Sequence, residues 1–177
     1  MSINRILVPT DFSENAQVAF ERAYDLARQL KARLYVLHVR DESNLRIAIR
    51  EGLLEAESTD EHLQAAVERL TEERFSKLIA GVDRSRVEIE HLSRRGDSDS
   101  TILAYAKEID ADIITIGRRG AGMMDNILSR VVGSVAETVI RKSPCPVLVV
   151  RRDHRVAEER GSADTTQEAE DGSQGSE

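Results

Sequence analysis

The sequence predicts an α/β fold, with a five-stranded, doubly wound parallel sheet in a three-layer α/β/α arrangement. Short apolar, β-branched runs alternate along the chain with stretches of helical periodicity, which is the pattern of parallel strands joined by helices. Residues 112–116, DIITI, are a compact, Ile-rich run that predicts a strand buried on both faces of a parallel sheet. The 177 residues amount to about one domain, long enough to bury a substantial core.

The first part of the chain predicts a strand, a helix and a second strand. Residues 4–9, NRILVP, are a short β-rich run, and residues 33–39 have a similar composition. Between them, residues 14–31 have helical periodicity, and Ser13 is a suitable N-cap. The apolar face of this helix consists of Ala16, Ala19, Phe20, Ala23, Ala27 and Leu30.

Residues 41–85 are charged and favour helix. A weak helical segment covers about 44–57, and a stronger one covers 60–80 before Gly81, a natural stop. The expected buried side of the stronger helix consists of Leu63, Ala66, Val67, Leu70 and Leu78, with Phe75 on its flank.

The rest of the chain supplies the remaining elements. Residues 86–92 alternate apolar and acidic side chains, as in a half-exposed strand, and residues 99–110 return to helical periodicity. The buried strand at 112–116 is followed by a glycine-rich loop, a helix at about 133–142 and a last strand at 146–150.

This element order limits the topology. Right-handed crossovers favour a flavodoxin-type or closely related doubly wound sheet. Ligands of such sheets bind beyond the carboxyl ends of the strands, at the point where the strand order reverses. Two segments with unusual chemistry follow strands: residues 10–13, TDFS, and the loop that starts at Gly117.

The loop after the fourth strand is the main candidate binding site. Its glycines, at positions 117, 120, 122 and 133, let the backbone approach a ligand closely. Ser134 and Glu137 have the S-x-x-E form of a capping box, which predicts a helix start whose N–H groups suit a phosphate. The loop matches neither the Walker motif nor the dinucleotide fingerprint. A surface loop with convenient glycines, followed by a capped helix, is the alternative interpretation.

Few side chains in the sequence point to catalysis. Arg118, Arg119 and Arg130 add positive charge that could screen a polyphosphate. Asp11 and Asp125 are the candidates for a metal contact, while no His or Cys residues have the spacing of metal ligands. No G-x-S-x-G nucleophile elbow occurs. The sequence therefore favours a binding module over an enzyme.

Composition excludes several classes of protein. A net charge of −7 argues against a general nucleic-acid binder and against attachment to anionic lipid. The single cysteine, Cys145, excludes a disulfide framework and a Cys-rich zinc site. No apolar run reaches the roughly 18 residues of a membrane span. The N-terminus runs straight into a strand pattern without a signal peptide. We expect a cytoplasmic protein with neither a membrane nor a nucleic-acid partner.

The negative charge is concentrated at the C-terminus. Residues 153–177 contain eight acidic and two basic side chains, a net of −6, which leaves −1 for residues 1–152. The segment contains no Leu, Ile, Phe, Tyr or Trp, so it cannot bury enough apolar surface to offset the entropy of ordering. We therefore expect one folded domain at 1–152 and a disordered acidic tail at 153–177.

Three stretches of the chain resemble the universal stress protein family, the small UspA-like domains. They are RILVPTDFS at 5–13, LYVLHV at 34–39, and DADIITIGRRGAG at 110–122 with GSVAETVIRKSPCPVLVVR at 133–151. Together they frame residues 3–151. The resemblance implies an adenine nucleotide α-hydrolase-like fold. Because many members bind ATP or related nucleotides, it also implies a nucleotide-binding module of the stress response.

The family's nucleotide motif, G-x2-G-x9-G-[S/T], implies roles for individual residues. Gly117, Gly120 and the pair Gly133-Ser134 match it, while residues 121–132 supply twelve spacer residues where the motif has nine. The resemblance implies the following binding residues: Pro9 in the wall, Asp11 toward the nucleoside, Val39 against adenine, Ile116 in the pocket lining, Gly117 and Gly120 beside the phosphates, and Gly133, Ser134 and Val135 as hydrogen-bond donors to them.

The resemblance also implies a cofactor and a partner. The cofactor is ATP, or AMP or ADP, with or without Mg²⁺. The partner is a second copy of the chain, paired through the last strand, Val147–Val150, whose Val-rich edge would be a liability if left open. Two alternatives stay open. One is a dimeric interaction protein with a vestigial, empty site, which the long spacer favours, and the other is a slow ATPase.

Overall fold

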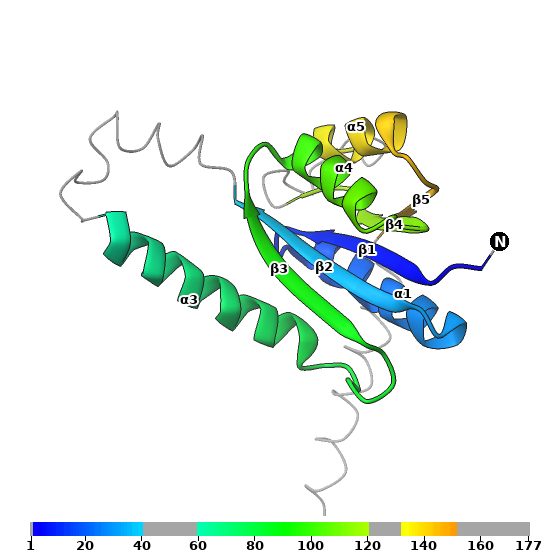
Figure 1. Ribbon diagram of the computed structural model, residues 1–177, viewed down its shortest axis with the longest axis horizontal. Helices are drawn as coiled ribbons and strands as arrows, with labels where there is room; N and C mark the ends of the chain where they lie inside the picture. The colour runs from blue at the N-terminus through cyan, green and yellow to red at the C-terminus, as the bar shows by residue number, and fades with distance from the viewer. Residues whose placement is uncertain (1, 41–59, 121–131, 152–177) are drawn as a thin grey trace, which may run out of the picture.

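Nine elements make up the described part of the chain, which is residues 2–40, 60–120 and 132–151 of a computed structural model (Figure 1). The strands are β1 (Arg5–Thr10), β2 (Arg33–Arg40), β3 (Ile89–Arg95), β4 (Ile113–Gly117) and β5 (Val147–Val150). The helices are α1 (Glu14–Leu30), α3 (Asp60–Ile79), α4 (Ser98–Glu108) and α5 (Ser134–Lys142). The helical segment expected at 44–57, nearly all of the spacer, Asp125, Arg130 and the tail at 153–177 lie outside the described residues.

The five strands form one parallel sheet in the order β3-β2-β1-β4-β5. β1 is central: its Leu7 is in register with Tyr35 of β2 on one side and Ile114 of β4 on the other. The prediction of a doubly wound parallel sheet is confirmed, in an order related to the flavodoxin order but different from it. The order reverses between β1 and β4, which places the expected ligand site at their carboxyl ends.

Helices cover both faces of the sheet, as the three-layer prediction requires. α4 and α5 lie on the side shown at the top of Figure 1, and α1 and α3 lie on the other. The core is accordingly divided in two. Phe20 and Phe75 belong to the cluster on the α1 and α3 side, whereas Ile102 and Val139 belong to the cluster under α4 and α5. Alternate residues of each buried strand feed the two clusters.

Side-chain caps set the starts of α1 and α4. The hydroxyl of Ser13 accepts a hydrogen bond from the Ala16 N–H at 3.3 Å, which confirms the predicted N-cap. Asp97 caps α4 through the Ser100 N–H at 3.1 Å. Both helices therefore begin right after a strand or a short turn at the carboxyl edge of the sheet.

The capping box predicted at Ser134 is wrong. Gly133 is the N-cap of α5, with φ −67° and ψ 151°, and no side chain bonds the first turn there. Ser134 is the first helical residue instead. The helix start was predicted within one residue, but the serine hydroxyl is not used as a cap.

Burial differs from the predicted pattern at three side chains. Leu30 and Leu70, expected on buried faces, are 42% and 52% exposed, whereas Phe75, expected on the flank of its helix, is fully buried. Periodicity identifies a stripe along a helix but not how much of that stripe meets the sheet. Figure 1 shows the first half of α3 standing away from the sheet, which accounts for the exposure of Leu70.

The strand predicted at 86–92 is displaced toward the C-terminus. β3 covers Ile89–Arg95, and its last residues, Arg94 and Arg95, are in register with Val39 and Arg40 of β2. Charged residues are tolerated there because β3 is an edge strand with one solvent side. Within the described ranges, no helix is both long and apolar enough to cross a membrane.

Candidate functional site

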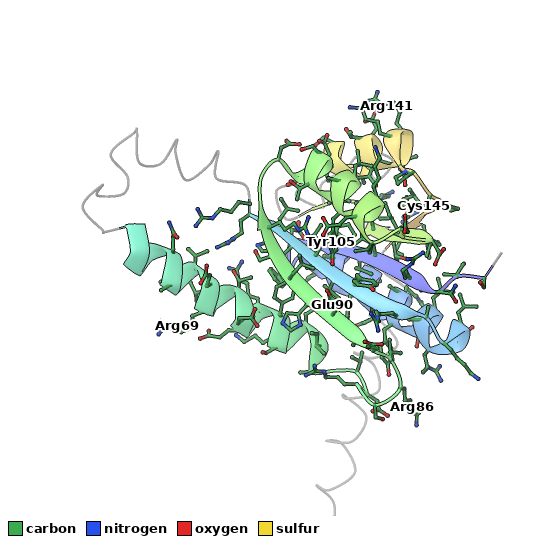
Figure 2. The ribbon with its side chains drawn as sticks, viewed as in Figure 1. Arg69, Arg86, Glu90, Tyr105, Arg141 and Cys145 are labelled. Carbon is green, nitrogen blue, oxygen red and sulfur yellow. The ribbon has the colours of Figure 1, made fainter. Side chains whose placement is uncertain are left out.

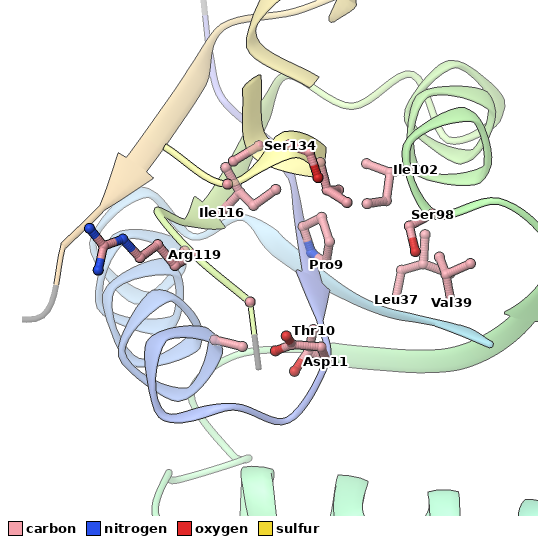
Figure 3. A pocket seen from close by; sticks show the side chains of 16 residues that line it. Pro9, Thr10, Asp11, Leu37, Val39, Ser98, Ile102, Ile116, Arg119 and Ser134 are labelled. Carbon is pink, nitrogen blue, oxygen red and sulfur yellow. The ribbon is translucent and has the colours of Figure 1, made fainter. Parts of the chain in front are cut away.

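A cavity of about 380 Å³ lies at the carboxyl ends of β1, β2 and β4, where the strand order reverses (Figure 3). Its volume falls in the range of small-molecule sites. The starts of α1, α4 and α5 also reach it, through Ala16, Ser98 and Ser134. Three helix N-termini and three strand ends therefore surround one space.

The structure brings all nine sequence-predicted ligand residues to the wall of this cavity. They are Pro9, Asp11, Val39, Ile116, Gly117, Gly120, Gly133, Ser134 and Val135. Residues far apart in the chain meet because every parallel strand ends at the same edge of the sheet. Their contact with a ligand stays a prediction.

One end of the cavity is apolar. Figure 3 shows Leu37, Val39 and Ile102 gathered at this end, with Pro9 lying between them and Ile116. Leu37 is fully buried and Ile102 is 3% exposed, so both are fixed by core packing. This end presents a rigid aliphatic surface that suits a flat, apolar group.

The other end of the cavity consists largely of backbone. Gly117, Gly120 and Gly133 line it next to the first turn of α5, whose N–H groups and helix dipole favour an anion. The Gly133 N–H donates to the Arg118 carbonyl at 2.9 Å, so the two ends of the long loop meet. The twelve-residue spacer therefore leaves the two halves of the glycine motif side by side.

Packing of α1 requires the glycine at 117. A Cβ there would lie 2.9 Å from the carbonyl oxygen of Asn15 and 3.1 Å from its carbonyl carbon. Both are backbone atoms of α1, and they cannot move without shifting the helix. The resemblance implied that this glycine admits phosphates, and the structure supplies a packing reason for it as well.

Asp11 and Gly120 are in close contact across the mouth of the cavity. A Cβ at Gly120 would lie 2.7 Å from Asp11 Oδ2. The other carboxylate oxygen, Oδ1, accepts a hydrogen bond from the Ser13 N–H at 3.0 Å. Asp11 therefore forms the turn before α1 and at the same time faces the glycine loop.

The loop arginines do not all face the cavity. Arg119 lines the cavity and is only 7% exposed, and in Figure 3 its guanidinium end extends away from the other labelled side chains. That Arg119 screens a polyphosphate stays a prediction. Arg118 is half-buried and does not line the cavity.

Sequence reasoning missed several cavity residues. They are Thr10, Ala16, Leu37, Ser98, Ile102 and Ala136. Leu37 was detectable, because it lies two residues before Val39 and so faces the same side of β2. Ser98 was also detectable, because Gly96-Asp97-Ser98 follows a strand and must lie at the same sheet edge. The others depend on how the helices pack.

His38 lies on the opposite face of β2 from the cavity. Its Nδ1 is 2.9 Å from the Thr10 carbonyl oxygen, and its ring packs against Phe12 at 4.6 Å. Burial, together with the charges of Arg74 and Arg40, lowers the pKa of His38 below its ordinary value, although the Thr10 carbonyl and Asp11 oppose this. A neutral imidazole with Nδ1–H donating to Thr10 fits this setting.

The remaining titratable groups form no second centre within the described segments. No group of three or more His, Cys, Asp or Glu residues there could hold a metal ion. Cys145 lies at the corner between α5 and β5, and burial raises the pKa of its thiol. Its N–H donates to the Ser143 hydroxyl at 3.2 Å, which indicates a structural role.

Comparison with known proteins identifies close relatives in sequence. The model described as the universal stress protein family matches residues 2–151. The universal stress protein MJ0531 of Methanocaldococcus jannaschii is 30% identical over 148 residues, which cover 84% of this chain and 82% of that protein. A putative universal stress protein of Staphylococcus aureus strain USA300 is 30% identical over 167 residues, which cover 94% of this chain and 95% of that protein.

Solved structures share the architecture. UspA from Lactobacillus plantarum has a TM-score of 0.64 and 28% identity, with coverage of 85% of this chain and 99% of that one. A universal stress protein in complex with cAMP has a TM-score of 0.53 and 22% identity, with coverage of 85% of this chain and 98% of that one. A universal stress protein family protein of Arabidopsis thaliana with AMP bound has a TM-score of 0.53 and 18% identity, with coverage of 86% of this chain and 94% of that one. The last two are similar to this chain in fold alone. The shared fold is adenine nucleotide α-hydrolase-like.

Proposed function

This chain belongs to the universal stress protein family, and from that premise we propose that it binds an adenine nucleotide, ATP first, in the cavity at the carboxyl edge of its sheet. One observation carries the proposal: a single cavity joins an apolar end to a glycine-lined helix start, with all nine predicted residues in its wall. Adenine nucleotides combine the two matching chemistries, a flat base and an anionic chain. Two proteins of the same fold have AMP or cAMP bound, so these nucleotides should be tested together with ATP.

The base belongs at the apolar end. Val39 and Leu37 lie on one side and Ile102 on the other, so the two faces of a planar ring would both meet aliphatic carbon. Transfer of such a surface from water contributes about 25 cal/mol per Å² buried. Ser98 supplies a hydroxyl at this end for the edge of the ring.

The phosphates belong at the glycine end. Gly120 and Gly133 leave room for close approach, and the first N–H groups of α5 are directed at an anion there. Asp11 is the residue that would hold Mg²⁺, because its carboxylate borders this end and Mg²⁺ is commonly bound by one carboxylate together with substrate phosphates. The bound ion would neutralise phosphate charge.

The protein would act as a dimeric regulatory module of the stress response, without turnover of the nucleotide. Phosphoryl transfer needs a held metal and a group that orients the attacking nucleophile. Asp11 is the single carboxylate that the described residues contribute to the cavity wall. That set supports binding and supplies no nucleophile-orienting base.

Calorimetric titration with ATP, ADP, AMP, cAMP and GTP tests the proposal. We expect adenine nucleotides to bind and Gly120→Ala to weaken ATP at least about tenfold, because its methyl group displaces the Asp11 carboxylate from the phosphate end. Gly81→Ala is the matched control. A Cβ at Gly81 meets nothing within 4 Å, and the residue is remote from the cavity lining.

Two results would count against this function. If no adenine nucleotide binds or raises the melting temperature at millimolar concentration, the vestigial-site alternative is correct, since a ligand at about 100 times its Kd adds about 2.7 kcal/mol. Steady release of phosphate that Asp11→Ala abolishes would instead establish a slow ATPase.

A further inference from the structure

A second cavity, of about 440 Å³, lies between the turn after β1 and the second half of α3. Its wall consists of Asp11, Phe12, Ser13, Gln17, Arg74, Lys77 and Leu78. Asp11 is the one residue that it shares with the first cavity. The two cavities therefore lie on opposite sides of the turn formed by residues 11–13.

The basic side chains of this second cavity come from one face of α3. Arg74 and Lys77 are three residues apart, so they are neighbours on the helix surface. Among the ion pairs of the described residues, none involves either of them. Together with Asp11 they leave the lining with one net positive charge. Two adjacent cations without a carboxylate partner repel each other, and an anion between them would relieve that repulsion.

The Asp11 carboxylate has neighbours within the turn and in the glycine loop. One oxygen accepts from the Ser13 N–H, and the other lies against Gly120 of the first cavity. Its negative charge is thus held toward the glycine loop, while Arg74 and Lys77 approach from α3. The two faces of the turn consequently differ in charge.

Phe12 forms the floor of the second cavity in a strained conformation. Its φ is 61°, in the left-handed region that a phenylalanine rarely adopts. Three contacts hold it: the Thr10 hydroxyl accepts its N–H at 3.0 Å, and its ring packs against Phe75 at 5.1 Å and His38 at 4.6 Å. Such strain is concentrated at functional turns.

The same ring positions one of the cations. The guanidinium carbon of Arg74 lies 5.8 Å from the centroid of Phe12, within cation–π range. A guanidinium held over a ring keeps its N–H edge available for an oxyanion, and arginine matches phosphate geometry better than lysine does. Lys77, one turn along, adds a second charge.

From the cavity, its two unpaired cations and the strained turn beside it, we propose that this second cavity is a binding site for a phosphate group, separate from the first cavity. Two sources have this chemistry: a free inorganic anion such as pyrophosphate, or the terminal phosphate of a nucleotide whose base lies in the first cavity. The second source rests on the proposed function, whereas the first does not.

The test compares Arg74→Gln/Lys77→Gln with Arg69→Gln, a control that removes one positive charge from the same helix outside the cavity lining. Figure 2 shows Arg69 on the side of α3 turned away from the sheet. Each protein is titrated with sodium pyrophosphate, ATP and AMP at constant ionic strength, and binding is followed by calorimetry and by melting temperature. Both target side chains are exposed, so the fold of the double variant is expected to be retained, and its ligand-free melting temperature checks this.

If the free anion is the source, pyrophosphate binds the wild type and the Arg69→Gln control, and the double variant weakens it at least about tenfold. If the nucleotide chain is the source, the double variant weakens ATP by a similar factor and leaves AMP unchanged. Equal affinities of all three proteins for both pyrophosphate and ATP would overturn the proposal, and so would an equal loss in the Arg69→Gln control. AMP reports on the first cavity, and failure of both AMP and ATP to bind any of these proteins would refute the proposed function and leave the pyrophosphate result standing.

Discussion

Gly117 and Gly120 belong to one loop, yet the structure requires glycine at the two positions for different reasons. At Gly117 a side chain would meet the backbone of Asn15, which moves only if α1 moves. At Gly120 it would meet the tip of the Asp11 side chain, which can rotate. A substitution at the first position therefore tests the fold, and one at the second tests the site.

Gly133→Ser should stabilise the protein and weaken ATP binding. The residue is an N-cap with φ −67°, a conformation that serine adopts freely, and a Cβ there is in ordinary contact at 3.5 Å from the Arg118 carbonyl. A serine hydroxyl would accept from the first N–H groups of α5, which no described side chain caps. Together with the loss of glycine flexibility in the unfolded chain, this should raise the free energy of unfolding by about 0.5–1 kcal/mol. The same N–H groups would no longer be available to phosphate. Thermal unfolding and ATP titration measure the two effects, and tighter ATP binding would contradict a phosphate end at α5.

At the scale of elements, a seam of rings attaches α3 to the sheet. Phe75 packs edge-on against Phe12 and lies 4.7 Å from the ring of His91, while His38 approaches it at 6.4 Å. Phe75 is the α3 member of this group and lies in the second half of the helix, whereas Leu70, earlier in α3, is half-exposed. Attachment of the helix therefore depends on a few aromatic contacts, one of them with the half-buried imidazole of His38.

Stability should consequently fall in mild acid. The pKa of His38 in the folded state lies below the 6.5 of the unfolded chain, because burial and the charges of Arg74 and Arg40 disfavour the imidazolium. Between those two values the unfolded state binds more protons, so the contribution of His38 is full above pH 6.5 and is lost as the pH falls. The free energy of unfolding, measured by urea denaturation between pH 7.5 and 5, should decrease in the wild type and be flatter in His38→Gln. An equal slope in both proteins would show that His38 does not titrate in this way.

The position of α4 is fixed by a different device. Arg94 of β3 makes a bidentate pair with Glu108, both hydrogen bonds being 2.6 Å, and its guanidinium lies 4.4 Å above the ring of Tyr105. Burial, followed by the charge of Glu90, raises the pKa of Tyr105 to about 12. These contacts anchor the helix whose start brings Ser98 to the first cavity.

At the scale of the whole molecule, the two edges of the sheet differ in character. The β3 edge includes Glu90, Arg94 and Arg95, and such charges discourage pairing with another chain. The β5 edge, Val147–Val150, has no charged residue, and Leu148 on it is 39% exposed. Among the described residues β5 has β4 as its one strand partner, and such an apolar edge supports the proposal of a homodimer through β5.

Val149→Pro should convert such a dimer to monomers. The carbonyl groups of Pro146 and Val150 accept hydrogen bonds from the N–H groups of Ile114 in β4 and of Arg118 directly after it. Alternation along the strand therefore turns the Val149 N–H to the open edge. Proline removes that donor while the pairing with β4 persists. Light scattering after gel filtration measures the mass, and Val149→Ala, which keeps the N–H, should stay dimeric. An unchanged mass for Val149→Pro would place the interface elsewhere.

Deletion of residues 153–177 should leave the folded domain and its ligand site intact. The segment holds a net charge of −6 and almost no apolar side chains, so its removal should take away charge without exposing a core. The melting temperature and the ATP affinity of the truncated chain should equal those of the full chain. A drop in either would mean that the tail packs against the domain.

Much of the fold followed from the sequence because its signals are local. Ser13 caps a helix through an atom three residues away, and the run at 112–116 can only be a buried strand, so element types and the parallel sheet were predictable. The family motif also directed attention to the residues now found around one cavity. Helix burial was less predictable, as Leu70 and Phe75 illustrate, because it depends on where the sheet ends beneath the helix.

The sequence by itself determined the alternation of strands and helices, the edge of the sheet at which the candidate binding residues lie, and the family that the motifs resemble. Only the tertiary structure decided the strand order, the packing reason for Gly117, the burial of Arg119 and the second cavity beside Phe12. The physical reason is the distance along the chain over which each interaction acts. Capping and periodicity act over a few residues, whereas these features arise from contacts between Asn15 and Gly117, or Phe12 and Arg74, which lie far apart in the chain.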